Sequence, residues 1–121
     1  MRYAVIGAGF WARFQLHGWK TVGEVQCVAV CDRDIAKARA LAADFGIAAA
    51  YEDAETMFGS ESFDFADIIT GVEAHKPLVE LAASHHIPVI CQKPLACTLE
   101  DAEEMVRCCR EAGVPLLVNE N

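Results

Sequence analysis

Short apolar runs alternate along the chain with longer segments in which apolar residues recur at helical spacing. The short runs predict strands at residues 3–6, 25–31, 47–50, 66–70, 88–91 and 115–118. The longer segments predict helices from residue 10 to Gly23, over 34–45, 52–58 and 75–84, and from Thr98 to the residue before Gly113. Strands and helices in this order form right-handed crossovers. The pattern therefore predicts an α/β fold with an open parallel sheet in the order 3-2-1-4-5-6 and helices on both faces.

Capping and turn residues support several of these boundaries. Gly46 follows the helical stripe of residues 34–45 and stops it. Pro77 suits a first helical turn, where its missing N–H is not needed. Thr98 and Asp101 have the spacing of a capping box. These signals agree with the periodicity, so local chemistry and hydrophobic pattern predict the same elements.

A glycine-rich turn joins the first predicted strand to the first helix. Gly7-Ala8-Gly9 and Ala12 form the pattern G-x-G-x-x-A. In such a turn Gly7 permits the sharp change of direction, Gly9 lets the backbone approach a pyrophosphate, and Ala12 lets the helix pack closely on the strand. The helix N-terminus then stabilises the negative charge of the phosphates. The turn predicts a dinucleotide-binding domain of the Rossmann type, whereas a purely structural turn is the plainer alternative.

Asp32 ends the second strand near the offset expected for the acid that binds a ribose diol. A carboxylate at this position repels a 2′-phosphate, which favours NAD as the cofactor. Arg33 follows directly, and its guanidinium suits stacking on adenine or pairing with a 2′-phosphate. NADP therefore remains the alternative, and a helix-capping role is the plain structural alternative for Asp32.

Composition narrows the class of protein. The chain has 121 residues, of which 54% are hydrophobic, and a formal net charge of −8. A single domain of this size buries a real core, and a parallel sheet covered on both faces explains the apolar fraction. No run approaches the roughly 20 apolar residues of a membrane span. The negative charge disfavours nucleic-acid and anionic-membrane partners.

Cysteine and histidine usage argues against metal and disulfide sites. The cysteines lie mostly within apolar periodic segments and lack C-x-x-C pairs, so we interpret them as reduced core residues of a cytoplasmic protein. The histidines lack ligand spacing, so no metal site is expected. These residues are Cys27, Cys31, Cys91, Cys97, Cys108 and Cys109, and His17, His75, His85 and His86.

Ligands of an open α/β sheet bind beyond the carboxyl ends of its strands. Those ends are predicted at residues 7–9, 32, 70–73, 91–94 and 119–121. Lys93, in the segment Gln92-Lys93-Pro94, is the candidate acid–base group, because a lysine at this edge can exchange a proton or hydrogen bond with a substrate hydroxyl or carbonyl. An exposed loop lysine without function is the alternative.

Taken together, the motifs resemble those of the glucose-fructose oxidoreductase, inositol dehydrogenase and MocA group of nicotinamide-dependent oxidoreductases, over essentially the whole chain. The resemblance implies that Lys93 contacts substrate and assists proton transfer, and that the Lys93–Pro94 peptide is cis. The motifs are residues 7–12, 31–33, 70–75, 89–96 and 118–121.

The same resemblance implies the set of residues that contact the cofactor. Thr70 and His75 are expected beside it, and Asn119 near its nicotinamide end. For His75 an equal alternative is a ring that only hydrogen-bonds backbone. The full set of expected cofactor contacts is Gly7, Ala8, Gly9, Phe10, Trp11, Asp32, Arg33, Thr70, Gly71, His75, Gln92, Lys93, Pro94 and Asn119. Phe10 and Trp11 have the alternative of packing as core residues.

Two departures from the family pattern qualify this function. Gln92 replaces the usual glutamate, which removes a carboxylate that would pair with Lys93. Family members also carry a second α/β domain that supplies most of the substrate pocket. The expectation is thus the cofactor domain, residues 1–121, of a homo-oligomeric enzyme that transfers hydride between the nicotinamide and a sugar, inositol or related polyol. Apolar surface is then expected near the sixth strand. An NAD(H)-sensing module without catalysis is the alternative, and a methyltransferase fits less well.

Overall fold

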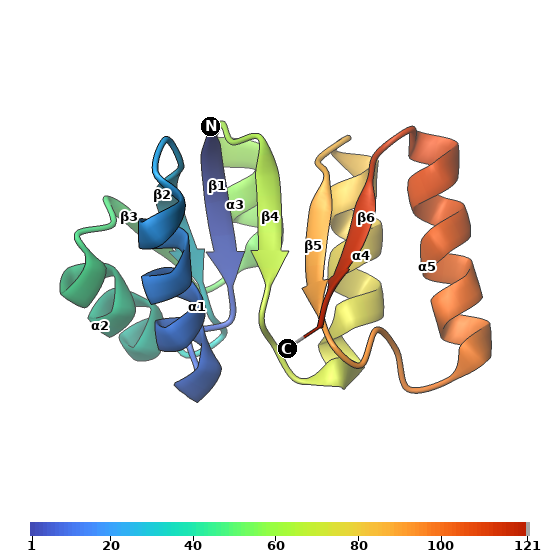
Figure 1. Cartoon of the computed structure of the whole chain (residues 1–121), viewed down its shortest axis with the longest axis horizontal. Helices are drawn as coiled ribbons and strands as arrows, with labels where there is room; N and C mark the ends of the chain where they lie inside the picture. The colour runs from blue at the N-terminus through green and yellow to red at the C-terminus, as the bar shows by residue number, and fades with distance from the viewer. Residues whose placement is uncertain (121) are drawn as a thin grey trace.

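The computed structural model describes residues 1–120 and contains a parallel six-stranded sheet in the order β3-β2-β1-β4-β5-β6 (Figure 1). This is the predicted order. All neighbouring strands pair in parallel, with Val5 opposite Val30 and Asp67, for example. The strands are β1 (Arg2–Ile6), β2 (Gln26–Cys31), β3 (Ala49–Tyr51), β4 (Phe65–Ile68), β5 (Val89–Gln92) and β6 (Leu116–Asn119).

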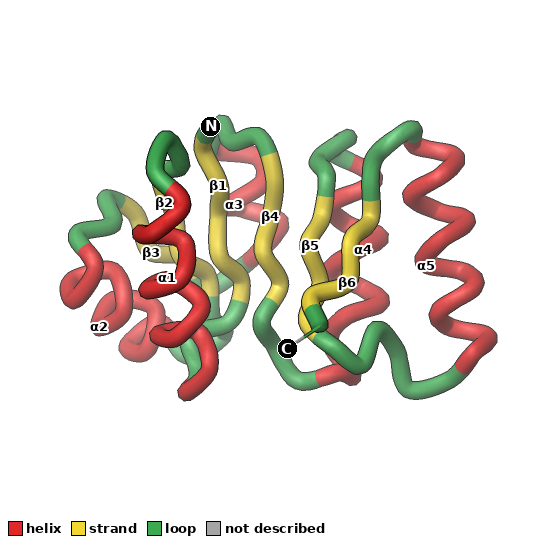
Figure 2. Tube along the Cα trace, in the orientation of Figure 1, coloured by secondary structure: helices red, strands yellow, loops and turns green. Residues whose placement is uncertain are grey.

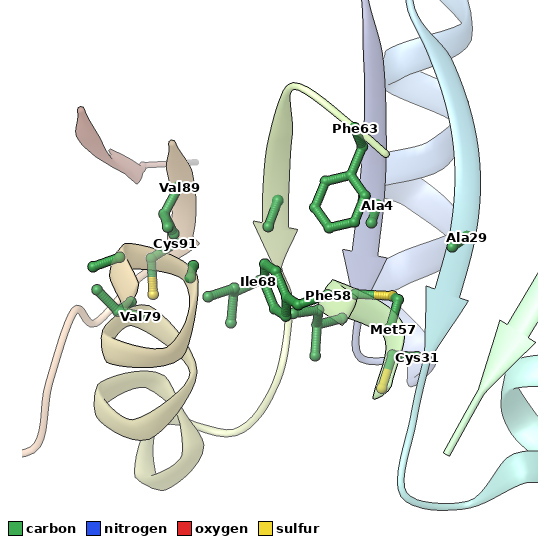
Figure 3. Close-up of a cluster of buried hydrophobic side chains, with 14 of the residues drawn as sticks. Ala4, Ala29, Cys31, Met57, Phe58, Phe63, Ile68, Val79, Val89 and Cys91 are labelled. Carbon is green, nitrogen blue, oxygen red and sulfur yellow. The ribbon is translucent and has the colours of Figure 1, made fainter. Parts of the chain in front are cut away.

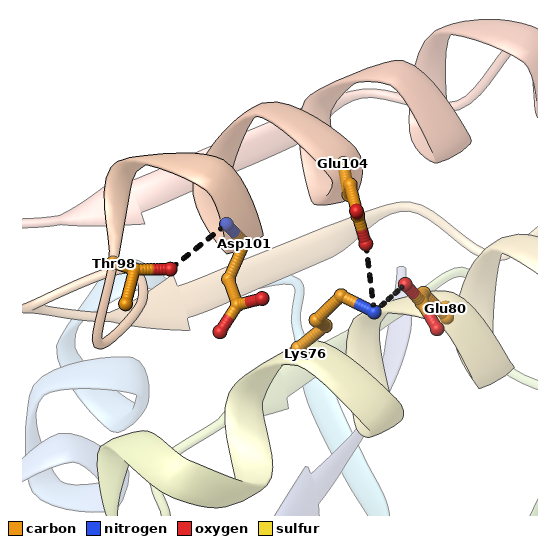
Figure 4. Close-up of polar contacts among 5 residues, drawn as sticks. All are labelled: Lys76, Glu80, Thr98, Asp101 and Glu104. Atoms are coloured by element: carbon orange, nitrogen blue, oxygen red, sulfur yellow. Dashed lines mark hydrogen bonds and ion pairs between the residues drawn. The ribbon is translucent and has the colours of Figure 1, made fainter.

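Helices separate the strands along the chain (Figure 2). They are α1 (Phe10–Val22), α2 (Ile35–Phe45), α3 (Ala54–Ser60), α4 (His75–Ser84) and α5 (Leu99–Ala112), with a short 3-10 turn η1 (Val72–Ala74) before α4. Helix α4 has the predicted bounds. Gly46 and Gly113 end α2 and α5 with φ of 67° and 71°, in the left-handed region that glycine adopts without steric cost. The Thr98 hydroxyl accepts a hydrogen bond from the Asp101 N–H at 3.1 Å, which confirms the predicted cap (Figure 4).

Some predicted boundaries were displaced by a few residues, for local reasons. The third strand begins at Ala49 because the N–H of Ile47 is committed to the Ala42 carbonyl at 2.8 Å, which closes the end of α2. Helix α3 begins two residues later than predicted because Asp53 caps it and accepts from the Thr56 N–H at 2.8 Å. Hydrogen bonds of single caps therefore decide boundaries that periodicity leaves open.

Two apolar cores lie on opposite faces of the sheet, as alternate residues of β1 show. Tyr3 and Val5 pack with α1 and α2, whereas Ala4 and Ile6 pack with α3, α4 and α5. Figure 3 shows part of the second core, in which Met57 and Phe58 of α3 lie on one side of Ile68 of β4 and Val79 of α4 lies on the other. The predicted cover of helices on both faces is confirmed.

Helices α4 and α5 are also joined on their outer side. Lys76 of α4 bonds Glu80 of the same helix at 2.8 Å and Glu104 of α5 at 3.1 Å (Figure 4). Partly exposed ion pairs of this kind contribute little stability individually. Of the two pairs, only Lys76–Glu104 links α4 to α5.

Cysteine positions agree in part with the reduced-core interpretation. All six cysteines are free thiols, and Cys31, Cys91 and Cys109 are buried. Burial raises the pKa of the Cys31 and Cys91 thiols to about 12, so both stay protonated at neutral pH. Cys97 is exposed in the loop before α5, so that residue is not part of a core.

Two observations concern the surface. Leu117 of the edge strand β6 is 55% exposed, so apolar surface lies where it was expected. Among the described helices, none has the length and apolar character that crossing a membrane requires.

Candidate functional site

The carboxyl ends of the parallel strands lie at one edge of the sheet, at the bottom of Figure 1. The glycine turn after β1, Asp32 after β2, the loop after β4 and the loop after β5 all emerge there. β1 lies between β2 and β4, where the strand order reverses direction. This edge is the place where open α/β sheets bind ligands.

Gly7 is required by its surroundings as well as by its backbone conformation. Its φ is +108°, and a Cβ at this position would lie 2.4 Å from the carbonyl oxygen of Ile69, just after β4. Its N–H donates to the Cys31 carbonyl at 2.8 Å. The turn is therefore fixed between the ends of two neighbouring strands, and only glycine fits.

Gly9 precedes α1 and leaves the helix N-terminus open. No heavy atom lies within 4 Å of a Cβ built at Gly9, and no side chain caps the first turn of α1. The first turn also has no acidic residue. Free N–H groups, an open approach and the positive end of the helix dipole together suit a phosphate group.

Asp32 holds the glycine turn in place, a role that the sequence did not reveal. Its Oδ2 accepts the N–H of Ala8 and its Oδ1 accepts the N–H of Asp34, both at 2.8 Å. A carboxylate offers about four lone-pair positions, so acceptor capacity for ribose hydroxyls remains. The side chain is half-buried at the mouth of the site, and Arg33 beside it is exposed.

Phe10 and Trp11 lie outside both cores, so the alternative of core packing is wrong for them. Phe10 is 79% exposed. The rings of Phe10 and Trp11 lie 5.2 Å and 5.3 Å from the ring of Phe14, one turn further along α1. The three rings form an aromatic cluster on the outer side of the helix, of which Phe14 had not been singled out from the sequence.

The loop after β5 presents Lys93. The lysine is exposed and the Lys93–Pro94 peptide bond is cis, as the resemblance implied. The backbone N–H of Lys93 donates to Oε1 of Gln92 at 2.9 Å. Residue 92 thus uses its side-chain oxygen on the lysine backbone, a role that the neutral amide oxygen of a glutamine can fulfil.

The Gln92 amide has one group without a partner. Gln92 is only 9% exposed, and among residues 1–120 its Nε2 has no acceptor. Because Oε1 accepts from the Lys93 N–H, the orientation of the amide is determined and the free group is the donor. A buried donor without an acceptor is unfavourable, and an oxygen atom of a bound molecule at this end of the site would satisfy it.

His75 is buried between the loops that follow β4 and β5. It is 0% exposed. Its Nδ1 lies 3.0 Å and 3.1 Å from the carbonyl oxygens of Pro94 and Leu95, and its Nε2 lies 3.2 Å from that of Thr70. The ring contacts backbone, as the alternative held, and the expected contact between His75 and the cofactor stays a prediction.

The remaining predicted contacts lie at the same edge. Thr70 is half-buried, and its hydroxyl donates to the Gly71 carbonyl at 3.0 Å. Gly71 is exposed. Asn119 pairs in register with Gln92 across β5 and β6, which places it beside the Lys93 loop. Asn121, the last residue of the strand-end segment, lies outside the described residues.

Two surface pockets lie at the opposite edge of the sheet. Both include Gln26 and Cys27 at the start of β2, together with Gly46. Burial raises the pKa of the Cys27 thiol to about 12, so this residue is not a nucleophile at neutral pH. In the described part of the chain, no group of three or more His, Cys, Asp or Glu side chains is arranged to hold a metal ion.

The residues at the carboxyl edge fit a nicotinamide dinucleotide. The glycine turn and the N-terminus of α1 would hold the pyrophosphate, and Asp32 the adenosine ribose. The unpartnered Gln92 amide and Lys93 lie at the other side of β4, where the nicotinamide half would extend.

Comparison with known proteins agrees with this geometry. The chain is 47% identical over its whole length to a D-apiose dehydrogenase of Rhizobium rhizogenes, and covers 35% of that protein. It is 32% identical over 122 aligned positions to an NADP-dependent D-xylose 1-dehydrogenase of Haloarcula marismortui, with 98% of this chain and 34% of the relative covered. The chain thus spans about a third of the length of these curated relatives.

Solved structures show the same fold. A crystal structure of an oxidoreductase from Agrobacterium radiobacter, in complex with NAD+, L-tartaric acid and magnesium, superposes with a TM-score of 0.96 at 47% identity. The match covers 99% of this chain and 35% of the other. The model of the oxidoreductase family with an NAD-binding Rossmann fold matches residues 1–120. The chain therefore belongs to the glucose-fructose oxidoreductase, inositol dehydrogenase and MocA family and corresponds to the NAD-binding Rossmann fold of that family.

Proposed function

We propose that this chain is the cofactor-binding domain of an NAD-dependent dehydrogenase that acts on a sugar or polyol. The observation that carries the proposal is the exposed Lys93, which lies at the same sheet edge as the glycine turn and the open N-terminus of α1. The relatives named as dehydrogenases of D-apiose and D-xylose support a polyhydroxylated substrate.

Each group at the edge has a distinct role in this proposal. When bound, the nicotinamide would accept a hydride in its oxidised form or donate one in its reduced form. The Lys93 ammonium donates a hydrogen bond to the reacting oxygen of the substrate, and its amine form takes the hydroxyl proton during oxidation. The Gln92 side chain holds the backbone of this lysine, and the cofactor contacts of Gly9, Asp32 and their neighbours position the other reactant.

NAD is favoured over NADP by the position of Asp32. Its carboxylate faces the glycine turn through the Ala8 N–H and the start of α2 through the Asp34 N–H. A 2′-phosphate brought to this place would meet the carboxylate charge. Arg33 is exposed beside it and would offset part of that repulsion, so selectivity is expected to be a preference and not an exclusion.

Calorimetric titration of the chain with NADH and NADPH tests the cofactor assignment. Wild type is expected to bind NADH more tightly. Asp32→Asn keeps one acceptor oxygen but removes the charge, so it should weaken NADH binding and narrow the gap to NADPH. Arg33→Ala is the matched control and should weaken NADPH more than NADH. If Asp32→Asn binds NADH and NADPH with the same affinities as wild type does, the proposed role of Asp32 is refuted.

A test of the catalytic role of Lys93 requires the complete substrate site. Because the curated relatives are about three times as long as this chain, we propose that residues outside it complete the substrate pocket. In such a complete enzyme, Lys93→Ala should lower kcat by a larger factor than it weakens NADH binding, whereas Lys93→Arg keeps the charge but not the ability to take a proton. Unchanged kcat in Lys93→Ala would contradict a catalytic lysine and favour a sensor of NAD(H).

Oligomerisation and location are part of the same proposal. The exposed Leu117 and Val118 of β6 support an apolar contact with further polypeptide, including a second copy. Six free thiols support a reducing compartment such as the cytoplasm. Sedimentation analysis of the complete protein tests the first of these assignments.

A further inference from the structure

We infer that His75 is a positioning residue that joins the two loops at the nicotinamide end of the site and thereby fixes the backbone next to Lys93. The inference rests on the function proposed for Lys93. It starts from the contacts of the imidazole, which reach both loops from a position at the beginning of α4.

The contacts of the ring are spread over the two loops. Nδ1 lies within hydrogen-bond distance of the Pro94 and Leu95 carbonyls, and Nε2 of the Thr70 carbonyl. These acceptors are 19, 20 and 5 residues away along the chain. An imidazole in either protonation state carries at least one N–H, so at least one of these contacts is a hydrogen bond donated by His75.

Burial makes this contact selective for histidine. The ring is fully buried, and the backbone carbonyls that surround it need donors in the absence of water. An aliphatic side chain would leave those carbonyls unpaired, and a lysine would place a long flexible chain in a closed space. A flat ring with a donor on its edge fits both requirements.

The Lys93 backbone is consequently held on both sides. Before it, Gln92 Oε1 accepts the Lys93 N–H at 2.9 Å. After it, Nδ1 of His75 lies 3.0 Å and 3.1 Å from the carbonyl oxygens of the next two residues. Lys93 itself is exposed, so without these contacts nothing else among the described hydrogen bonds fixes its backbone. We therefore assign to His75 the function of fixing the position of the Lys93 backbone, from which the lysine side chain extends.

Three variants of this chain separate positioning from packing. His75→Phe keeps a buried ring and removes both nitrogens. His75→Gln keeps a donor and should restore part of the effect. His86→Phe is the matched control, because His86 also lies near a backbone carbonyl, that of Ala112 at 3.2 Å, but is exposed at the far end of α4.

Amide hydrogen exchange is the first measurement. In His75→Phe, exchange should rise about tenfold at residues 93–98 and 70–74 while the amides of β1 and β2 keep their protection, because only local opening becomes easier. The exchange rates of His75→Gln in these loops should lie between those of wild type and His75→Phe, and those of His86→Phe should match wild type. A uniform rise over the whole sheet, or no change in the Lys93 loop, would overturn the inference. If His75→Phe does not fold, the comparison of His75→Gln with wild type decides it.

A double-mutant cycle on NADH affinity is the second measurement. His75→Phe should weaken binding roughly 2- to 10-fold, the loss expected for one hydrogen bond. In a Lys93→Ala background the same change should have a clearly smaller effect, because the positioned side chain is absent. Additive effects would show that His75 does not act through Lys93. If wild type binds no NADH, the proposed function fails, and the exchange experiment still decides whether His75 orders the loop.

Discussion

Replacing Gly7 with alanine gives a quantitative test of the glycine turn. A Cβ at Gly7 would lie 2.4 Å from the Ile69 carbonyl oxygen and 2.7 Å from the carbon of the same group. Both atoms belong to backbone, so the clash is relieved only if β1 and β4 separate. Forcing a methyl group into a packed site costs about 1–3 kcal/mol. The positive φ of 108° adds about 1–2 kcal/mol for a residue with a Cβ.

The sum is about 2–5 kcal/mol, a large part of the roughly 5–15 kcal/mol that holds an ordinary domain folded. Urea unfolding of wild type and Gly7→Ala measures this loss of unfolding free energy. With a slope of about 2 kcal/mol per molar urea, a loss of about 3 kcal/mol lowers the midpoint by about 1.5 M. Gly46→Ala isolates the conformational contribution, because φ there is +67° but no heavy atom lies within 4 Å of a Cβ.

Comparison of the two variants also removes the effect of alanine on the unfolded chain, which is the same in both. Gly7→Ala should therefore be the less stable of the two by the steric part alone. Equal midpoints would refute the argument from close approach. Gly9→Ala completes the set: the position is open, so stability should change by less than about 0.5 kcal/mol while NADH affinity falls.

Further predictions concern a buried acid and a helix cap. Asp67 of β4 accepts hydrogen bonds from Trp19 Nε1 at 2.6 Å and Gln15 Nε2 at 3.2 Å, and burial raises the pKa of its carboxyl above the usual 3.8. Its protonated form is therefore favoured in the folded state, and the stability it contributes is lost as pH rises from about 4 through the folded pKa. Asp67→Asn should be at least as stable as wild type at pH 7, with the difference vanishing below pH 4; a destabilised variant at pH 7 with unchanged pH dependence would contradict this. Thr98→Ala should lower the free energy of unfolding by about 1 kcal/mol through loss of the cap on α5, and Thr98→Ser should retain it; urea midpoints compare them.

The sequence predicted most of the fold because its signals are local and repeated. Among residues 1–120, periodicity located the strands and the α-helices but not the 3-10 turn η1. Gly46, Thr98 and Gly113 acted at the predicted helix ends. Strand order followed from the alternation of elements and the handedness of crossovers. Errors arose at boundaries such as the start of β3, where one hydrogen bond from Ile47 decides between cap and strand.

Side-chain partners in the site were less predictable. The motif placed Asp32 near a ribose, but its hydrogen bond to Ala8 spans 24 residues and depends on the register of β1 against β2. The ring of His75 reaches carbonyls up to 20 residues away, so its burial depends on how two loops fold over it. Phe10 and Trp11 are apolar yet exposed, and local sequence does not report which face of α1 remains uncovered.

These long-range contacts share one physical feature that bears on function. Asp32 binds the glycine turn, Gln92 binds the lysine backbone, and His75 binds the loops on either side, so each loop at the carboxyl edge is held by a polar side chain. Loops held in this way lose less conformational entropy when a ligand binds, which favours affinity and correct orientation. Among the side chains of residues 1–120, the buried donor left without an acceptor is Gln92 Nε2, at the same edge. An acceptor oxygen brought to that donor by a bound molecule would couple ligand binding to the order of the Lys93 loop.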